Sequence, residues 1–152
     1  EMTLDAAAAA LRAMEGLAGA ITIVDNDSGD GSFEQISGYV ADAGLADVRV
    51  VQSGRNGGFG AGNNVAMFDP LSDGRVPDYV YLLNSDAFPE PDAIRALREY
   101  LLQRDAAVVK LGSGGSTATS TAAGGDSSST VSRSSVATST GSCVAAMRPA
   151  RL

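Results

Sequence analysis

Short apolar runs alternate along the chain with stretches in which apolar residues recur every three or four positions. One such run, Tyr79 to Leu83, carries no charge and is followed directly by Asn84, Ser85 and Asp86. A run this short and this apolar is typical of a strand buried on both faces in the middle of a parallel sheet. We therefore expect Tyr79–Leu83 to be the central strand of the fold.

The same pattern predicts the remaining elements. Further strands are expected over 20–24, 48–51, 106–111 and 143–147. Helices are expected over 3–17, from 32 to a stop at Gly44, over 63–68 and over 91–103. Ser32 with Gln35 predicts a capping box at the start of the second helix. Alternating helices and strands with short links predict an α/β fold, Rossmann-like, with a mostly parallel sheet flanked by helices.

The composition changes abruptly near residue 113. From there to residue 142 the chain is almost entirely Ser, Thr, Gly and Ala, with few large apolar side chains. Such a segment buries too little apolar surface to offset the entropy of ordering it, so we expect it to be flexible. The predicted division is an α/β domain over 1–112, this segment over 113–142, and a strand-like tail over 143–152.

The totals exclude several classes of function. The chain has 152 residues, a net charge of −7, one cysteine and no histidine. An acidic protein is poorly suited to binding nucleic-acid backbone, and without histidine a Ser-His-Asp triad or a His-ligated zinc site is impossible in this chain. No apolar run approaches the roughly 20 residues of a membrane span. The lone cysteine favours a reducing, cytoplasmic location.

Polar loops follow three of the expected strands, and in a parallel sheet such loops gather at one edge. The first loop begins with Asp25, Asp27 and Asp30. These acids resemble a calcium-binding loop, although Gly29 and Ile36 stand where that loop needs ligands. The acids also suit a plain strand-to-helix turn, and Asp25 could instead accept the imide N–H of a uracil or thymine ring.

The second loop, residues 54–62, is rich in glycine and leads into Asn63 and Asn64. Asn63 stands where a dinucleotide fingerprint needs glycine, and no lysine is near for a phosphate-binding P-loop. The loop is either flexible or a place where backbone approaches a ligand closely, with the asparagines at the helix entrance.

The third loop contains Asp86. It is either a strand-ending turn or, with diphosphate oxygens and water completing the shell, a site for Mg²⁺ or Mn²⁺.

In this order and spacing, the three loops resemble family 2 glycosyltransferases, particularly bacterial enzymes that transfer rhamnose or galactofuranose. The residues that carry the likeness lie between 20 and 112: Val24-Asp25-Asn26 with Ser28, Asp30, Gly31 and Ser32; Asn56-x-Gly58-Phe59-Gly60-x-Gly62-Asn63-Asn64; and Leu82-Leu83-Asn84-Ser85-Asp86 with Pro89. The resemblance implies a GT-A fold, a Rossmann-like domain that binds a nucleotide-sugar.

The resemblance also implies roles for single residues. Asp25 would contact the base, Asn84 would lie near the ribose or sugar, and Asp86 would meet the metal and the diphosphate. The full set implied for nucleotide-sugar binding is Asp25, Asn26, Asn56, Gly58, Phe59, Gly60, Asn63, Asn64 and Asn84.

A metal-dependent, inverting transfer from a UDP- or dTDP-linked sugar to a glycan or lipid-linked saccharide is the activity this resemblance implies. It would belong to cell-wall or polysaccharide synthesis, in the cytoplasm or peripherally at the inner membrane face. Relatives begin with a strand ending in a Thr-Tyr-Asn-like turn and carry an acidic base beyond a segment like Gly141–Arg148. This sequence lacks both features, so we expect an incomplete GT-A domain and assign no catalytic residue.

Two other classes of function remain open from the sequence. One is a non-catalytic nucleotide-sugar-binding or interaction domain, which would bind donor and form no product. The other is a calcium-binding module that uses Asp25, Asp27 and Asp30.

Overall fold

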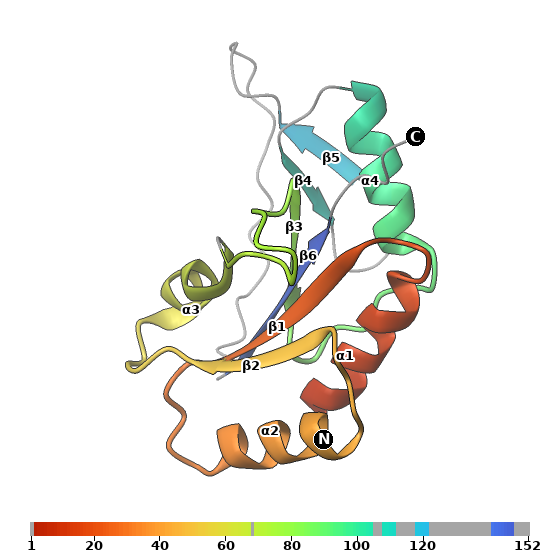
Figure 1. The fold of residues 1–152 in the computed structure, drawn as a ribbon. Helices are drawn as coiled ribbons and strands as arrows, with labels where there is room; N and C mark the ends of the chain where they lie inside the picture. The colour runs from red at the N-terminus through yellow and green to blue at the C-terminus, as the bar shows by residue number, and fades with distance from the viewer. Residues whose placement is uncertain (1, 68, 105–107, 112–117, 122–140, 148–152) are drawn as a thin grey trace.

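The structure is a computed structural model that describes residues 2–67, 69–104, 108–111, 118–121 and 141–147. Four helices and six strands lie within these residues (Figure 1). In chain order they are α1 (Met2–Ala13), β1 (Gly19–Asp25), α2 (Ser32–Asp42), β2 (Val48–Gln52), α3 (Gly58–Met67), β3 (Tyr79–Asn84), α4 (Ala93–Arg104), β4 (Val108–Leu111), β5 (Ala118–Thr121) and β6 (Gly141–Met147).

Four of the strands form one sheet in the order β2-β1-β6-β3. Strands β1 and β2 are parallel, and β6 is antiparallel to both of its neighbours. Strands β1, β2 and β3 therefore run in the same direction, with one reversed strand among them. The predicted α/β, Rossmann-like fold is confirmed.

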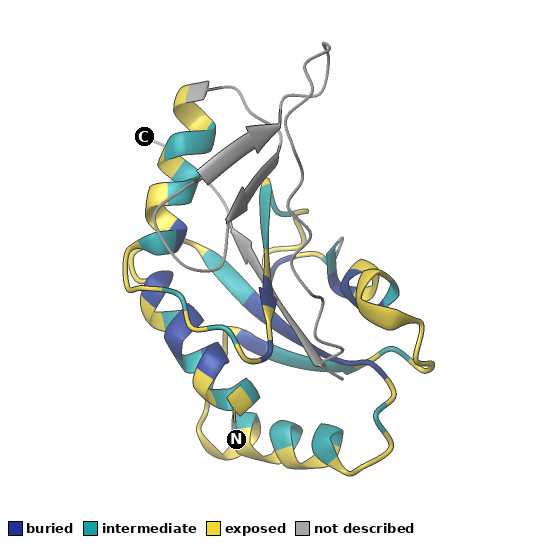
Figure 2. Ribbon diagram, turned by 180° about the vertical axis from the view of Figure 1, so that it is seen from behind, coloured by how far each residue is buried: buried dark blue, intermediate teal, exposed yellow. Residues whose placement is uncertain are grey.

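The side chains of β1 alternate between the two faces of this sheet, as the pleat of a strand requires. Ile21 and Ile23 belong to a buried cluster with residues of α1 and with Ile94 of α4. Val24 belongs to a second cluster with Ala66 of α3. Strand β1 is therefore covered on both faces, which Figure 2 shows as a continuous buried stretch.

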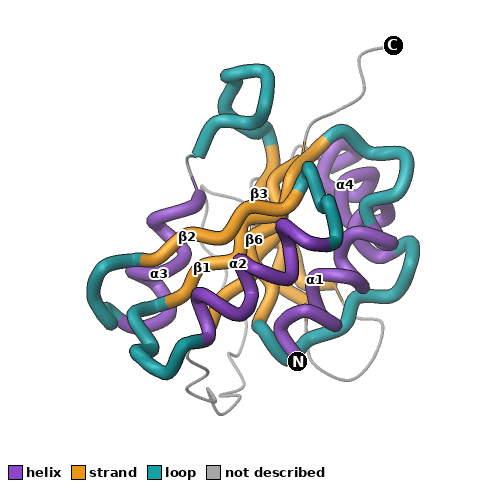
Figure 3. The backbone as a smooth tube through the Cα atoms, turned by 60° about the horizontal axis from the view of Figure 1, so that its bottom comes forward, coloured by secondary structure: helices purple, strands orange, loops and turns teal. Residues whose placement is uncertain are grey.

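The helices lie on opposite faces of the sheet for a topological reason. The chain passes from β1 to β2 on one side, and then returns past β1 to reach β3. Right-handed crossovers in opposite directions place their helices on opposite faces. Figures 1 and 3 show α1 and α2 together on one face and α3 on the other.

Strand β3 differs from its prediction as a central strand buried on both faces. It lies at the edge of the four-stranded sheet among the described strands, and its only described neighbour is β6. Leu83 is buried, but Leu82 is 42% exposed. The prediction was wrong because an uninterrupted apolar run does not report which strands lie beside it.

The tail strand has a larger part in the fold than its position suggests. Strand β6, which includes the whole predicted tail strand 143–147, lies between β1 and β3 and pairs with both. Of the segment 113–142, residues 118–121 form β5, which pairs with β4 in a separate two-stranded sheet. Residues 112–117 and 122–140 lie outside the described residues, and the division of the chain into domains stays a prediction.

The ends of two helices differ from the sequence pattern. Helix α1 ends at Ala13 and is followed by a turn in which the Leu17 N–H donates to the Met14 carbonyl at 2.8 Å. Helix α3 begins at Gly58, five residues before its predicted start. Within the described part of the chain, no helix has both the length and the apolar character needed to cross a bilayer.

Replacing Ile21 by Ala tests the cluster between β1 and α1. Ile21 is fully buried, so the substitution is expected to lower the free energy of unfolding by about 2–5 kcal/mol in urea denaturation. Val76→Ala, at an exposed loop position, is the control and is expected to change it little. Equal effects of the two substitutions would contradict the described core.

Candidate functional site

The carboxyl ends of β1, β2 and β3 meet at one edge of the sheet. Asp25, the last residue of β1, is in register with Gln52, the last residue of β2. Strand β6 begins at this same edge, because Gly141 pairs with Asp25 and Ser142 pairs with Asn84 of β3. The three predicted loops therefore leave the sheet on one side.

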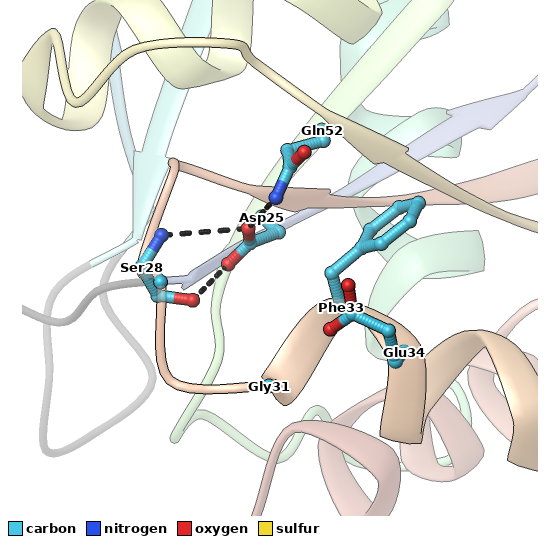
Figure 4. A pocket seen from close by; sticks show the side chains of 7 residues that line it. Asp25, Ser28, Gly31, Phe33, Glu34 and Gln52 are labelled. Carbon is cyan, nitrogen blue, oxygen red and sulfur yellow. Dashed lines mark hydrogen bonds between the residues drawn. The ribbon is translucent and has the colours of Figure 1, made fainter.

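Asp25 is a buried carboxylate, 5% exposed, with three hydrogen bonds (Figure 4). Its Oδ1 accepts from the Ser28 hydroxyl at 2.5 Å. Its Oδ2 accepts from Gln52 Nε2 at 3.0 Å and from the Ser28 N–H at 3.4 Å. These donors come from the loop after β1 and from β2, so they hold the carboxylate in one orientation.

Asn26, 6% exposed, joins the loop after β1 to the glycine-rich stretch. Its Nδ2 donates to Asn56 Oδ1 at 3.1 Å, and its Oδ1 accepts from the Ser53 hydroxyl at 3.1 Å. Gly62 of α3 lies directly against this amide, because a Cβ at residue 62 would be 3.3 Å from Asn26 Oδ1. Asn26 thus connects β1, the loop after β2, and α3.

The glycine-rich stretch starts a helix instead of forming the long predicted loop. The side chain of Asn56 stabilises this start, since its Oδ1 accepts from the Gly58 N–H at 3.3 Å in an Asx turn. Phe59 and Gly60, predicted within the loop, lie in the first turn of α3. Propensity alone disfavours a helix with three glycines, so local hydrogen bonds decide its start.

Asn63 and Asn64 differ in burial although they are neighbours in α3. Asn64 is exposed, whereas Asn63 is 2% exposed. Asn63 Nδ2 donates to the Phe59 carbonyl at 2.9 Å, while its Oδ1 is buried without a donor among the described residues. A buried acceptor without a donor is uncommon, and it suits a group that a ligand would satisfy.

A cavity of about 250 Å³ lies between the end of β1, the start of α2 and the end of β2. Figure 4 shows the Asp25 carboxylate and the Phe33 ring near one another at this cavity. Its lining residues are Asp25, Ser28, Gly29, Gly31, Phe33, Glu34 and Gln52. An apolar ring beside a fixed acceptor can bind a planar ring that carries an N–H group.

Asp86 and Asn84 are exposed at the end of β3, on either side of the buried Ser85. Strand β6 separates β3 from β1, so the two strands lie about 10 Å apart. The Asp86 side chain is open to solvent. The structure thus brings Asp86 to the same sheet edge as Asp25 but not into contact with it.

The sequence model described as Glycosyl transferase family 2 matches residues 1–127. The chain belongs to glycosyl transferase family 2. No curated protein and no solved structure matches the chain.

Family 2 membership, together with the helices and a mixed sheet in which β1, β2 and β3 run in the same direction, identifies the fold as a Rossmann-like fold of the GT-A type. It also supports glycosyltransferase activity as the general class of function. The roles of single residues stay predictions.

The calcium-binding alternative has no support in the first loop of this family 2 chain. Asp25 accepts from Ser28 and Gln52, and Asp30 accepts from the Ser32 N–H at 3.0 Å and from the Ser32 hydroxyl. The described residues contain no group of three His, Cys, Asp or Glu side chains that could hold a metal ion.

The predicted capping box at the start of α2 is not formed. Gly31 occupies the N-cap in a left-handed conformation, φ 83°, with no side-chain cap hydrogen bond. The Ser32 hydroxyl donates to Asp30 instead. This hydrogen bond and the one from the Ser32 N–H lower the pKa of Asp30 below its ordinary value of 3.8.

Two polar residues of the site, Gln52 and Ser53, were missed by the sequence prediction. Both come directly after the apolar run of β2, as Asp25 and Asn26 do after the run of β1. The rule that polar residues at the carboxyl end of a strand line the site would have included them.

Gly62→Ala tests the contact between α3 and Asn26. Alanine in a helix interior normally adds about 0.5–1 kcal/mol of stability relative to glycine. Gly38→Ala in α2, where a Cβ meets open space, is expected to show this gain. Gly62→Ala is expected to show none or a loss in urea denaturation, because its Cβ would press on the buried amide. Equal gains would contradict the contact.

Asp30→Asn tests the hydrogen bonds around Asp30. Because folding lowers the pKa of Asp30, its ionised form stabilises the fold above about pH 3.8, and this contribution is lost as the pH falls further. We expect the variant's melting temperature to fall less steeply between pH 4 and pH 2 than that of the parent. Glu99→Gln, at an exposed position of α4, is the control and should keep the parent's slope. An unchanged slope for Asp30→Asn would contradict the assignment.

Proposed function

We propose that this family 2 chain binds a UDP- or dTDP-linked sugar at the shared edge of β1, β2 and β3, for transfer to an acceptor hydroxyl with inversion. The observation that carries the proposal is the buried, oriented carboxylate of Asp25 in a cavity at this edge. In doubly wound sheets, ligands bind beyond the carboxyl ends of the strands where the chain reverses its direction of winding. Here that position is the end of β1.

The base of the donor would occupy the cavity beside Asp25. A uracil or thymine ring carries one imide N–H, and the Asp25 carboxylate is an acceptor fixed to receive it. Phe33 lines the same cavity and offers an aromatic face for stacking. Asn26 would act indirectly, through its hydrogen bonds to Asn56 and Ser53.

The start of α3 would approach the phosphates and the sugar. Gly58 and Gly60 have no side chains, so a ligand can approach the backbone at the start of α3 closely, and the N-terminus of a helix favours anions. The buried Asn63 Oδ1 could accept from a donor hydroxyl. Phe59 in the first turn of α3 and Asn64 further along the helix are both exposed and would form the rim.

Asp86 would hold Mg²⁺ or Mn²⁺ together with the diphosphate, and Asn84 would lie near the ribose or sugar. Both side chains are exposed and supply oxygen atoms, which these cations prefer. One carboxylate is sufficient where phosphates and water complete the shell. When bound, the cation would supply positive charge that stabilises the departing diphosphate.

The proposed reaction is a single displacement. The acceptor oxygen would bond to the anomeric carbon while the bond from this carbon to the diphosphate oxygen breaks. The acceptor proton would pass to a carboxylate base that we do not assign among the described residues. Attack opposite the leaving group inverts the anomeric configuration.

The resemblance to rhamnosyl- and galactofuranosyltransferases supports these sugars, with a glycan or lipid-linked saccharide as acceptor. Synthesis of cell-wall or other polysaccharides would be the setting. Such donors and the single cysteine favour the cytoplasm, with peripheral binding at the inner membrane face for a lipid-linked acceptor.

Asp86→Ala tests the proposed metal-diphosphate contact. We expect calorimetry to show UDP or dTDP binding that depends on Mg²⁺ or Mn²⁺, and Asp86→Ala to weaken it at least about tenfold. The reason is the loss of the carboxylate that would hold the cation. Asp78→Ala, an exposed carboxylate at the opposite end of β3, is the matched control.

If Asp86→Ala binds the nucleotide as tightly as the parent does, Asp86 is not part of the binding site. Absence of nucleotide binding in the parent, with either cation, would overturn the proposed function. Binding without sugar transfer to any glycan or lipid-linked acceptor would favour the non-catalytic alternative.

A further inference from the structure

The three hydrogen bonds to Asp25 come from two residues that have no role in the proposed function, Ser28 and Gln52. They reach the carboxylate from different elements. Ser28 belongs to the loop directly after β1, and Gln52 ends β2. Because Asp25 and Gln52 are partners in the parallel register, the backbone of the sheet fixes their separation.

These donors fill most of the acceptor capacity of the carboxylate. An ionised carboxylate has about four lone-pair sites, two on each oxygen. Asp25 Oδ2 accepts from Gln52 Nε2 at 3.0 Å and from the Ser28 N–H at 3.4 Å. Oδ1 accepts only from the Ser28 hydroxyl, at 2.5 Å, among the described residues. One site remains, on Oδ1, so a ligand can offer Asp25 one N–H but not two in parallel.

Nucleobases differ in how many adjacent N–H donors they present to a carboxylate. Uracil and thymine each present a single imide N–H, flanked by two carbonyl groups. Guanine presents two adjacent N–H donors, which pair with both oxygens of a free carboxylate in a bidentate arrangement. A carboxylate with one oxygen already occupied can still accept the single imide N–H of uracil or thymine. It cannot form the bidentate pair with guanine.

We propose that Gln52 is a specificity-determining residue, which selects uracil or thymine over guanine by occupying Oδ2 of Asp25. This inference rests on the proposed function, because it requires that the base binds at the cavity. Figure 4 shows Gln52 above the carboxylate, on the side opposite Ser28, with both residues lining the cavity. Glu34, also in the lining, is an acceptor only and cannot replace the Gln52 donor.

Gln52→Met tests the inference, since methionine keeps the length of the side chain and removes its N–H donors. Calorimetry in Mg²⁺ would measure the Kd of UDP and of GDP for the parent and the variant. We expect the parent to prefer UDP, and the ratio of the GDP Kd to the UDP Kd to fall about tenfold in the variant. Gln103→Met, at an exposed position of α4, is the matched control and should keep the parental ratio.

Ser28→Ala is a second, independent variant. It removes the hydroxyl from Oδ1 but leaves Oδ2 occupied by Gln52 Nε2 and the backbone N–H of residue 28, so the ratio should stay near the parental value. If Gln52 only holds Asp25 in place, Gln52→Met would weaken both nucleotides equally and leave the ratio unchanged. An unchanged or increased ratio in Gln52→Met would overturn the inference, and so would an equal fall in Ser28→Ala, while UDP binding by the parent would keep the proposed function. A parent that binds neither nucleotide would overturn both.

Discussion

Asp25 and Asn26 are polar side chains at the end of a strand that is covered on both faces, and their need for hydrogen-bond partners organises the surrounding loops. A buried carboxylate or amide is costly unless it is hydrogen-bonded. Asp25 obtains its partners from Ser28 and Gln52, and Asn26 obtains its partners from Ser53 and Asn56. The loops after β1 and β2 are thereby held against each other, and α3 begins where they meet.

Most of the fold could be predicted from the sequence, because the periods of helices and strands are local properties. The α/β class, the four helices and five of the six described strands follow from these periods. The order of the strands in the sheet does not follow from these periods. Strand β6 lies between β1 and β3, and this placement depends on contacts between residues far apart in the chain. It separates β3 from β1, and β3 lies at the edge of the sheet among the described strands, which its apolar sequence does not indicate.

In the candidate site, too, local features could be predicted from the sequence and contacts between distant residues could not. Asp25 and Asp86 were predicted because polar residues follow apolar strands in the sequence, and Asn26 was predicted from the resemblance to family 2 glycosyltransferases. Their partners were not, since the contact between Asp25 and Gln52 arises from the register of two strands. The start of α3 was placed too late for a related reason. Glycine propensity disfavours a helix there, while the Asn56 side chain provides the hydrogen bond that begins it.

The position of β6 has a consequence for the order in which this protein folds. A ribosome delivers β1, β2 and β3 before β6, so the nascent chain holds two strands whose shared neighbour has not yet been made. Until β6 emerges, the facing edges of β1 and β3 carry unpaired N–H and C=O groups, which are open to pairing with other chains. Closure of the sheet pairs β6 with strands far away in the chain, and contacts of such high contact order form slowly.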